Sequence, residues 1–196
     1  MSSAENASGV TRGEWAYAAV GAVGAVAVVA SVTAAPGSRG AVGAVLAMLM
    51  LAIAVVDARH FIIPNELSAA AAAFAFVHIW VDGAGLSLDA VWLALLRGAA
   101  MALLFLAVRT VYARWRGRQG LGMGDVKLAG VAGLWLDWFT LPVVLEIAAL
   151  AGIVIYLARQ RILGRPVLAT GRLPFGLFLA PAIWLGWLIE VMLPPL

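Results

Sequence analysis

The sequence predicts an all-α protein, a polytopic bundle of about seven transmembrane helices. Of its 196 residues, 64% are hydrophobic and only 12% are charged, whereas soluble domains are nearer half apolar and one quarter charged. The mean hydropathy is +1.02. The apolar residues form long runs, and most basic residues lie between these runs. A lipid bilayer is therefore the expected environment, and a single membrane domain over residues 1–196 is the expected organisation.

Seven segments are candidates for membrane-spanning helices, which need roughly 20 mostly apolar residues. Turn-forming residues separate them: Pro36-Gly37 follows the first segment, Pro64 precedes the third and Asp82-Gly83 follows it. The first segment also resembles a secretory signal peptide, and its cleavage would leave six helices. The expected spans are about 14–34, 40–56, 67–81, 88–112, 126–139, 141–158 and 174–193.

The orientation follows from the arginines and lysines, because basic residues favour the cytoplasmic loops of membrane proteins. Alternate connections hold nearly all of them, and Arg39 alone lies in the opposite set. The sequence therefore predicts a cytoplasmic N-terminus and a C-terminus on the opposite side of the membrane. The cytoplasmic set is Arg12, Arg59, Arg114, Arg116, Arg118, Lys127, Arg159, Arg161, Arg165 and Arg172, with Arg109 near a helix end.

Composition argues against several functional classes. Cysteine is absent, which excludes disulfides, thiolate metal sites and a cysteine nucleophile within these residues. Two histidines, His60 and His78, are too few for a multi-histidine metal site. The net charge of +3 fits membrane topology better than binding of nucleic acid, because the charges cluster between apolar spans. No metal or cofactor is expected.

Asp57 and Asp125 are the candidate catalytic residues. Ionisable groups near bilayer depth are costly and usually functional. Asp57 closes the second expected span and Asp125 opens the fifth, so both lie at the cytoplasmic end of their helices. A helix from Asp125 to Phe139 is about 22 Å long, less than the roughly 30 Å of a hydrocarbon core. Asp125 is therefore expected slightly inside the membrane.

Two neighbouring carboxyl groups suit peptide hydrolysis. They do not both ionise easily, so one keeps its proton. The ionised group then activates water as a general base, and the protonated group donates to the scissile carbonyl and to the leaving amine. Each residue also has a structural interpretation. Asp125 can cap the fifth helix, and Asp57 can pair with Arg59 at the interface.

Three short motifs stand out: Gly122-Met123-Gly124-Asp125, Asp57 followed by Ile63-Pro64-Asn65, and Leu173-Pro174-Phe175-Gly176. Together they resemble the type IV prepilin peptidases, a family of intramembrane aspartyl peptidases. Gly122-Met123-Gly124-Asp125 matches their Gly-x-Gly-Asp sequence, and Asp57 followed by Ile63-Pro64-Asn65 resembles their other aspartate segment. Leu173-Pro174-Phe175-Gly176 resembles their Pro-Phe-Gly segment. The resemblance covers about residues 40–193.

The resemblance implies an aspartic endopeptidase of the cytoplasmic membrane, with Asp57 and Asp125 as its catalytic pair. Such enzymes remove basic leader peptides from type IV prepilins and pseudopilins at the cytoplasmic face, just before the hydrophobic helix of the substrate. The larger members carry paired cysteines that are associated with N-methylation. Because this sequence has no cysteine, cleavage without N-methylation is expected, as in the short forms.

Several neighbouring residues are predicted to support this site. Gly122 and Gly124 permit close approach of an extended substrate. Lys127 either stabilises negative charge or extends to the interface. Pro64 and Asn65 are expected to form the turn and cap of the third helix. Pro174, Phe175 and Gly176 line the substrate path or form a bent helix start.

Three expectations lie outside this motif set. Arg97, inside the fourth span, needs a partner, for which Glu146 is the candidate. A small ion- or proton-coupled transporter is an alternative function, since buried acids also mark ion pathways. An archaeal-type preflagellin peptidase is another, because it shares the Gly-x-Gly-Asp motif. The sequence identifies neither the substrate nor the oligomeric state.

Overall fold

A computed structural model of the chain describes residues 3–84, 86–118, 120–163 and 174–193. Within these ranges the regular structure is helical, which confirms the all-α prediction. A short π-helical segment, Trp80–Ala84, continues the third helix. Leu173, Arg165 and Arg172 lie outside the described residues. The seven α-helices are α1 (Ser3–Ala34), α2 (Ser38–His60), α3 (Asn65–Ile79), α4 (Leu88–Arg116), α5 (Met123–Trp135), α6 (Thr140–Leu163) and α7 (Gly176–Met192).

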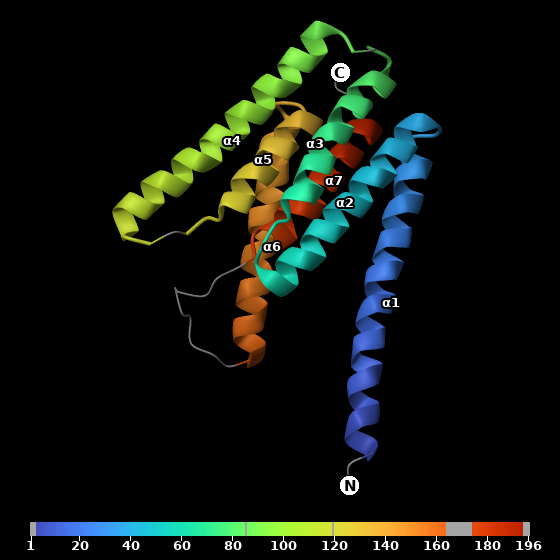
Figure 1. The fold of residues 1–196 in the computed structure, drawn as a ribbon, viewed down its shortest axis with the longest axis vertical. Coiled ribbons are helices and arrows are strands. Elements are labelled where there is room, and N and C mark those ends of the chain that lie inside the picture. Colours follow the sequence, from blue (N-terminus) through green and yellow to red (C-terminus); the bar gives the residue numbers. More distant parts are fainter. Residues whose placement is uncertain (1–2, 85, 119, 164–173, 194–196) are drawn as a thin grey trace.

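Four helices form the centre of the bundle. Each of α2, α3, α5 and α7 packs against two of the others in a closed ring, while α1 lies along α2, α4 lies along α5 and α6 lies along α7 (Figure 1). The core fills the ring with fully buried apolar side chains from all four helices. Examples are Ile53, Ala71, Leu128 and Ile183.

Four helical segments are long and apolar enough to cross a membrane: Glu14–Ala34, Ser38–His60, Leu88–Arg116 and Thr140–Ala158. The helices α3, α5 and α7 are shorter, with 15, 13 and 17 residues. All three belong to the central ring. The polytopic helical membrane protein expected from the sequence is therefore confirmed, with its three short helices in the central ring.

The fifth helix ends earlier than expected. Leu136 has an extended backbone, and the next residue, Asp137, donates its main-chain N–H to Glu190 on α7 at 2.7 Å. The predicted end at Phe139 is therefore wrong, because this side-chain contact fixes a turn before α6. From Asp125 to Trp135 the helix is only about 16 Å long by the same rise per residue, compared with the expected 22 Å.

Arg97 has a different partner from the one predicted. Its Nη1 donates to Asp137 Oδ1 at 2.9 Å, and its Nε donates to the main-chain oxygen of Gly133 at 3.3 Å. Glu146 is exposed on α6, so the predicted Arg97–Glu146 pair is wrong. The early end of α5 explains the difference, because it brings Asp137 next to α4.

Replacement of Arg97 is expected to lower stability modestly. Arg97→Gln removes the charge that faces Asp137, whose side chain is 54% exposed, so solvent screening limits the effect to about 1 kcal/mol. For a chain of this size that corresponds to a melting temperature about 2–4 °C lower. Thermal unfolding in detergent measures the shift, with Glu146→Gln as the control. Equal shifts in the two variants would contradict the assigned pairing.

Helices α4 and α5 approach each other through glycine. A Cβ added at Gly133 would lie 2.4 Å from the main-chain oxygen of Arg97, well inside contact distance. On the facing helix, a Cβ at Gly98 would lie 3.1 Å from Leu134. Small residues of this kind let helices pack closely in lipid, where apolar surface alone does not drive their association.

Candidate active site

Asp57 is buried near the end of α2 and is held by the start of α7. Its carboxyl group accepts a hydrogen bond from the main-chain N–H of Leu177 at 2.9 Å. Only 4% of the surface of Asp57 is exposed. The first N–H groups of a helix lack partners within the helix and carry partial positive charge. The α7 N-terminus therefore offsets part of the cost of burying this carboxyl group.

Arg59 does not serve as the partner of Asp57. Its guanidinium group lies over the ring of Tyr17 on α1, 5.3 Å from the ring centroid. The interfacial Asp57–Arg59 pair that the sequence allowed is therefore wrong. The chain then leaves α2 through Phe61, which has a left-handed backbone with φ of 56°. This conformation is uncommon for a bulky residue, and it directs the chain sharply towards Ile63.

Asp125 occupies the first turn of α5. Its Oδ2 accepts a hydrogen bond from the main-chain N–H of Gly122 at 3.0 Å. The cap position itself belongs to Gly122, so Asp125 stabilises the helix start from the third helical position and not from the predicted cap position. The residue is also buried, with 8% of its surface exposed. Gly124, the residue before Asp125, and Gly176, which lies against Asp57, both pack against the side chain of Ile63. The two carboxyl groups thus lie on either side of one isoleucine, each at the start of a helix with one oxygen fixed by a main-chain N–H.

Ile63 packs against glycines of the other two sequence motifs, a contact that its own motif does not reveal. A Cβ added at Gly124 would lie 2.9 Å from Ile63 Cβ, and one added at Gly176 would lie 2.8 Å from Ile63 Cδ1. The same atom at Gly176 would lie 2.8 Å from Asp57 Oδ2. The isoleucine side chain is therefore wedged between the segment that precedes Asp125 and the segment that holds Asp57.

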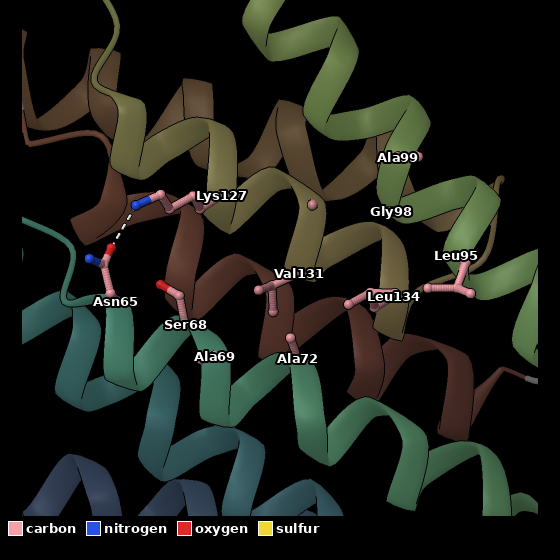
Figure 2. A pocket seen from close by; sticks show the side chains of 11 residues that line it. Asn65, Ser68, Ala69, Ala72, Leu95, Gly98, Ala99, Lys127, Val131 and Leu134 are labelled. Atoms are coloured by element: carbon pink, nitrogen blue, oxygen red, sulfur yellow. Dashed lines mark hydrogen bonds between the residues drawn. The ribbon is translucent and has the colours of Figure 1, made fainter.

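Asn65 and Lys127 form a separate pair. Lys127 Nζ donates to Asn65 Oδ1 at 2.6 Å, which joins α5 to the start of α3 (Figure 2). Asn65 is the first residue of α3, and the cap position belongs to Pro64 without a side-chain cap bond. The predicted Asn65 cap is therefore wrong, because its amide binds Lys127 instead. The turn at Pro64 is confirmed.

Residues of α4 fix the loop before Asp125. Arg109 Nε donates to the main-chain oxygen of Leu121 at 3.2 Å. A Cβ added at Gly120 would lie 2.5 Å from the ring of Tyr112, so the ring lies directly against this glycine. Neither contact is predictable from the sequence, which shows only a basic and an aromatic residue near the end of the fourth span.

Phe175 and Pro174 lie just before α7. The ring of Phe175 packs at a tilt against that of Phe105 on α4, with centroids 6.2 Å apart. Phe175 also borders a cavity of about 350 Å³ along α6. Both residues are half-buried. Their predicted place on a substrate path stays a prediction.

Gly176→Ala is expected to impair the site more than the fold. The added methyl group would meet Asp57 Oδ2 and Ile63 Cδ1, each at 2.8 Å, and so would displace the carboxyl group from the α7 N-terminus. Overpacking of this kind costs roughly 1–3 kcal/mol. We expect activity to fall by at least about tenfold, because 1.4 kcal/mol corresponds to that factor.

Initial rates and thermal unfolding of the same preparations measure the effect of Gly176→Ala. Gly21→Ala is the control, because the space around Gly21 on α1 is open. Unchanged activity in Gly176→Ala would show that Asp57 does not need its present position.

Among the residues that the structure describes, no group of three or more His, Cys, Asp or Glu side chains is arranged to hold a metal ion. The fold and the site define a polytopic helical membrane protein with two buried carboxyl groups at one end of its bundle. Such a pair can exchange protons with a water molecule and a substrate.

Comparison with known proteins gives the family. The model of the type IV leader peptidase family matches residues 44–157. This chain belongs to the type IV leader peptidase family. The match includes both aspartates and ends before Pro174-Phe175-Gly176. It is therefore shorter than the family core expected from the sequence, residues 40–193.

Over the aligned segments, curated relatives are about one third identical to this chain. Prepilin leader peptidase/N-methyltransferase of Dichelobacter nodosus is 30% identical over 71% of this chain and 45% of its own length. The protein of that name from Stutzerimonas stutzeri is 30% identical over 71% of this chain and 46% of its own. The protein of that name from Burkholderia pseudomallei is 33% identical over 67% of this chain and 40% of its own length. This chain thus spans less than half the length of these relatives. No solved structure matches it.

Proposed function

We propose that this chain is an aspartic endopeptidase that cleaves the leader peptide of type IV prepilins or pseudopilin-like substrates at the cytoplasmic membrane face. One observation carries the proposal. Asp57 and Asp125 come from different helices, both are buried, and they lie on either side of Ile63, which packs against Gly124 beside Asp125 and Gly176 beside Asp57, in a chain of the leader peptidase family. That membership also favours a peptidase over the transporter alternative.

The reaction would proceed by general acid–base catalysis. The ionised carboxyl group takes a proton from a water molecule, which attacks the scissile carbonyl carbon. The protonated carboxyl group donates its proton to the carbonyl oxygen, which gives a tetrahedral diol. When the diol collapses, the carboxyl group that took the proton from water donates it to the leaving amine, and the other carboxyl group recovers a proton from a diol hydroxyl. Because the two acids interact, the assignment of the proton belongs to the pair rather than to Asp57 or Asp125 individually.

The supporting residues would keep the acids in place. Gly124 and Gly176 leave room for Ile63 beside the pair, and Gly122 supplies the N–H that orients Asp125. Lys127 lies two positions beyond Asp125 and is held by Asn65. Lys127 would act at the substrate entrance, where its ammonium group can donate to main-chain oxygens of the substrate.

The cytoplasmic location of the site is supported by the distribution of arginines. Arg59, Arg114, Arg116 and Arg161 lie in the last turns of α2, α4 and α6, the ends that carry one of the acids or lead to a helix start that holds one, whereas Arg39 lies in the first turn of α2 at the other end of that helix. Basic residues of this kind favour the cytoplasmic side. Arg39 is paired there with Asp82, which partly neutralises its charge on the outer side.

Cleavage of a defined substrate tests the proposal. A prepilin with a basic leader and a hydrophobic helix is incubated with the purified protein in lipid, and the new N-terminus is determined by mass spectrometry. We expect removal of the leader at one peptide bond. An intact substrate after prolonged incubation would refute the proposal.

The same measurement addresses N-methylation. The relatives carry N-methyltransferase in their names, and for this chain cleavage without methylation stays a prediction. The expected product with S-adenosylmethionine present has an unmodified N-terminus. A product heavier by one methyl group would contradict that prediction but not the peptidase assignment.

A further inference from the structure

A groove runs along the outside of α5, between α3 and α4. Its volume is about 560 Å³, within the range of pockets that hold organic ligands. The side chains of Ala69, Leu95 and Ala99 on its borders are exposed. The groove therefore opens on the outer surface of the bundle, where lipid or another helix can reach it. Figure 2 shows the lining residues.

The groove has one polar end and one apolar end. The hydrogen-bonded pair Asn65 and Lys127 marks the polar end. Beyond it the walls consist mostly of small residues, including Ala72 on α3, Ala99 on α4 and Gly130 on α5. Small residues let the backbone of a neighbouring helix come close, which is how helices recognise each other in lipid.

The polar end of the groove lies at the same end of α5 as Asp125. Lys127 follows Asp125 by two residues, so it lies about 3 Å further along the helix and on its opposite side. On the α3 side of the groove, Asn65 follows Ile63 by two residues, and Ile63 packs against Gly124 and Gly176. One extended residue spans about 3.3–3.6 Å, so a few extended residues can connect the groove with the acids.

We propose that this groove binds the hydrophobic transmembrane helix of the substrate, a step that rests on the proposed peptidase function. The helix lies against the small residues of α3, α4 and α5, and the scissile bond lies beyond the Asn65–Lys127 end. A substrate segment must be extended there to be cleaved, so its main-chain groups need new partners. The Asn65 amide and the Lys127 ammonium supply an acceptor and donors for them.

A bulky side chain in the groove tests this docking site. Ala99→Trp projects into the groove from an exposed position on α4, and Ala107→Trp, also exposed on α4 but outside the groove, is the matched control. We expect Ala99→Trp to raise KM for the full-length substrate by about tenfold, while Ala107→Trp leaves it unchanged.

A shortened substrate separates docking from catalysis. A soluble peptide that spans the cleavage site but lacks the hydrophobic helix is expected to be cleaved equally by wild type and Ala99→Trp. If Ala99→Trp cleaves the full-length substrate as wild type does, the groove is not the docking site, although the peptidase function stands. If wild type cleaves neither substrate, the proposed function fails, and the docking inference fails with it.

Disulfide cross-linking identifies the occupant directly, because the chain has no cysteine of its own. Ala99→Cys and Ala107→Cys are each combined with Asp125→Asn, to retain uncleaved substrate, and with single cysteines along the substrate helix. Cross-links at position 99 with helical periodicity, absent at position 107, support the proposal. Equal cross-linking at both positions, or a dimer of the chain linked through position 99, would overturn it in favour of lipid or a second copy.

Discussion

Asp57→Asn and Asp125→Asn are each expected to abolish leader cleavage while the protein still folds in the membrane. Asparagine has nearly the same shape, and its amide oxygen can still accept the N–H of Leu177 or Gly122 that the carboxyl group accepts. It cannot take a proton from water or donate an acidic one. Loss of an essential general acid or base lowers kcat by about a thousandfold or more.

The rate of leader removal, measured for each variant at equal protein concentration, tests both residues. Asp89→Asn serves as the control, because Asp89 is exposed in the first turn of α4. Both catalytic variants should elute as folded protein with unchanged melting temperatures. A variant that processes substrate at the wild-type rate would remove that aspartate from the catalytic pair.

Gly133→Ala is expected to cause the largest loss of stability among single methyl additions to α5. The new Cβ would lie 2.4 Å from the main-chain oxygen of Arg97 and 2.7 Å from the main-chain nitrogen of Gly98. Backbone atoms cannot turn aside as a side chain can, so α4 must move away from α5. We expect a cost of about 3 kcal/mol, the upper end of the usual range for overpacking.

Gly130→Ala is the matched control for Gly133→Ala. Gly130 lies on the same helix, and a Cβ there would meet its nearest neighbours at 3.5 Å, an ordinary contact distance. Alanine is favoured over glycine in helices by about 1 kcal/mol. Thermal unfolding should therefore show Gly130→Ala at or above wild type and Gly133→Ala well below it. Equal stabilities would mean that α4 and α5 do not depend on this close approach.

The number of helices and their approximate positions could be predicted because apolar length and turn residues are local properties. The second helix and the turn at Pro64 are examples. The end of α5 could not be predicted, because Leu136 continues the apolar run and the turn depends on a distant residue, Glu190. The partner of Arg97 was wrong for the same reason, since Asp137 reaches it only when α5 ends early.

The candidate site was predictable in its residues but not in its architecture. Motif spacing singled out Asp57 and Asp125, and their catalytic role stays a proposal. No local pattern showed that Ile63 lies between two glycines or that Leu177 binds Asp57. These contacts join positions far apart in the chain, so they depend on how the helices pack. The Asn65–Lys127 bond is of the same kind.

The bond between Leu177 and Asp57 has a consequence for biosynthesis. Helix α7 follows all the other described helices in the chain, so a nascent chain that has inserted α1 to α6 already contains both aspartates. It does not yet contain the N–H group that holds Asp57, or Gly176, which packs against Ile63. The site around the two acids is therefore completed only when α7 enters the membrane. A nascent chain without α7 contains both aspartates but lacks the contacts that position Asp57 and Ile63.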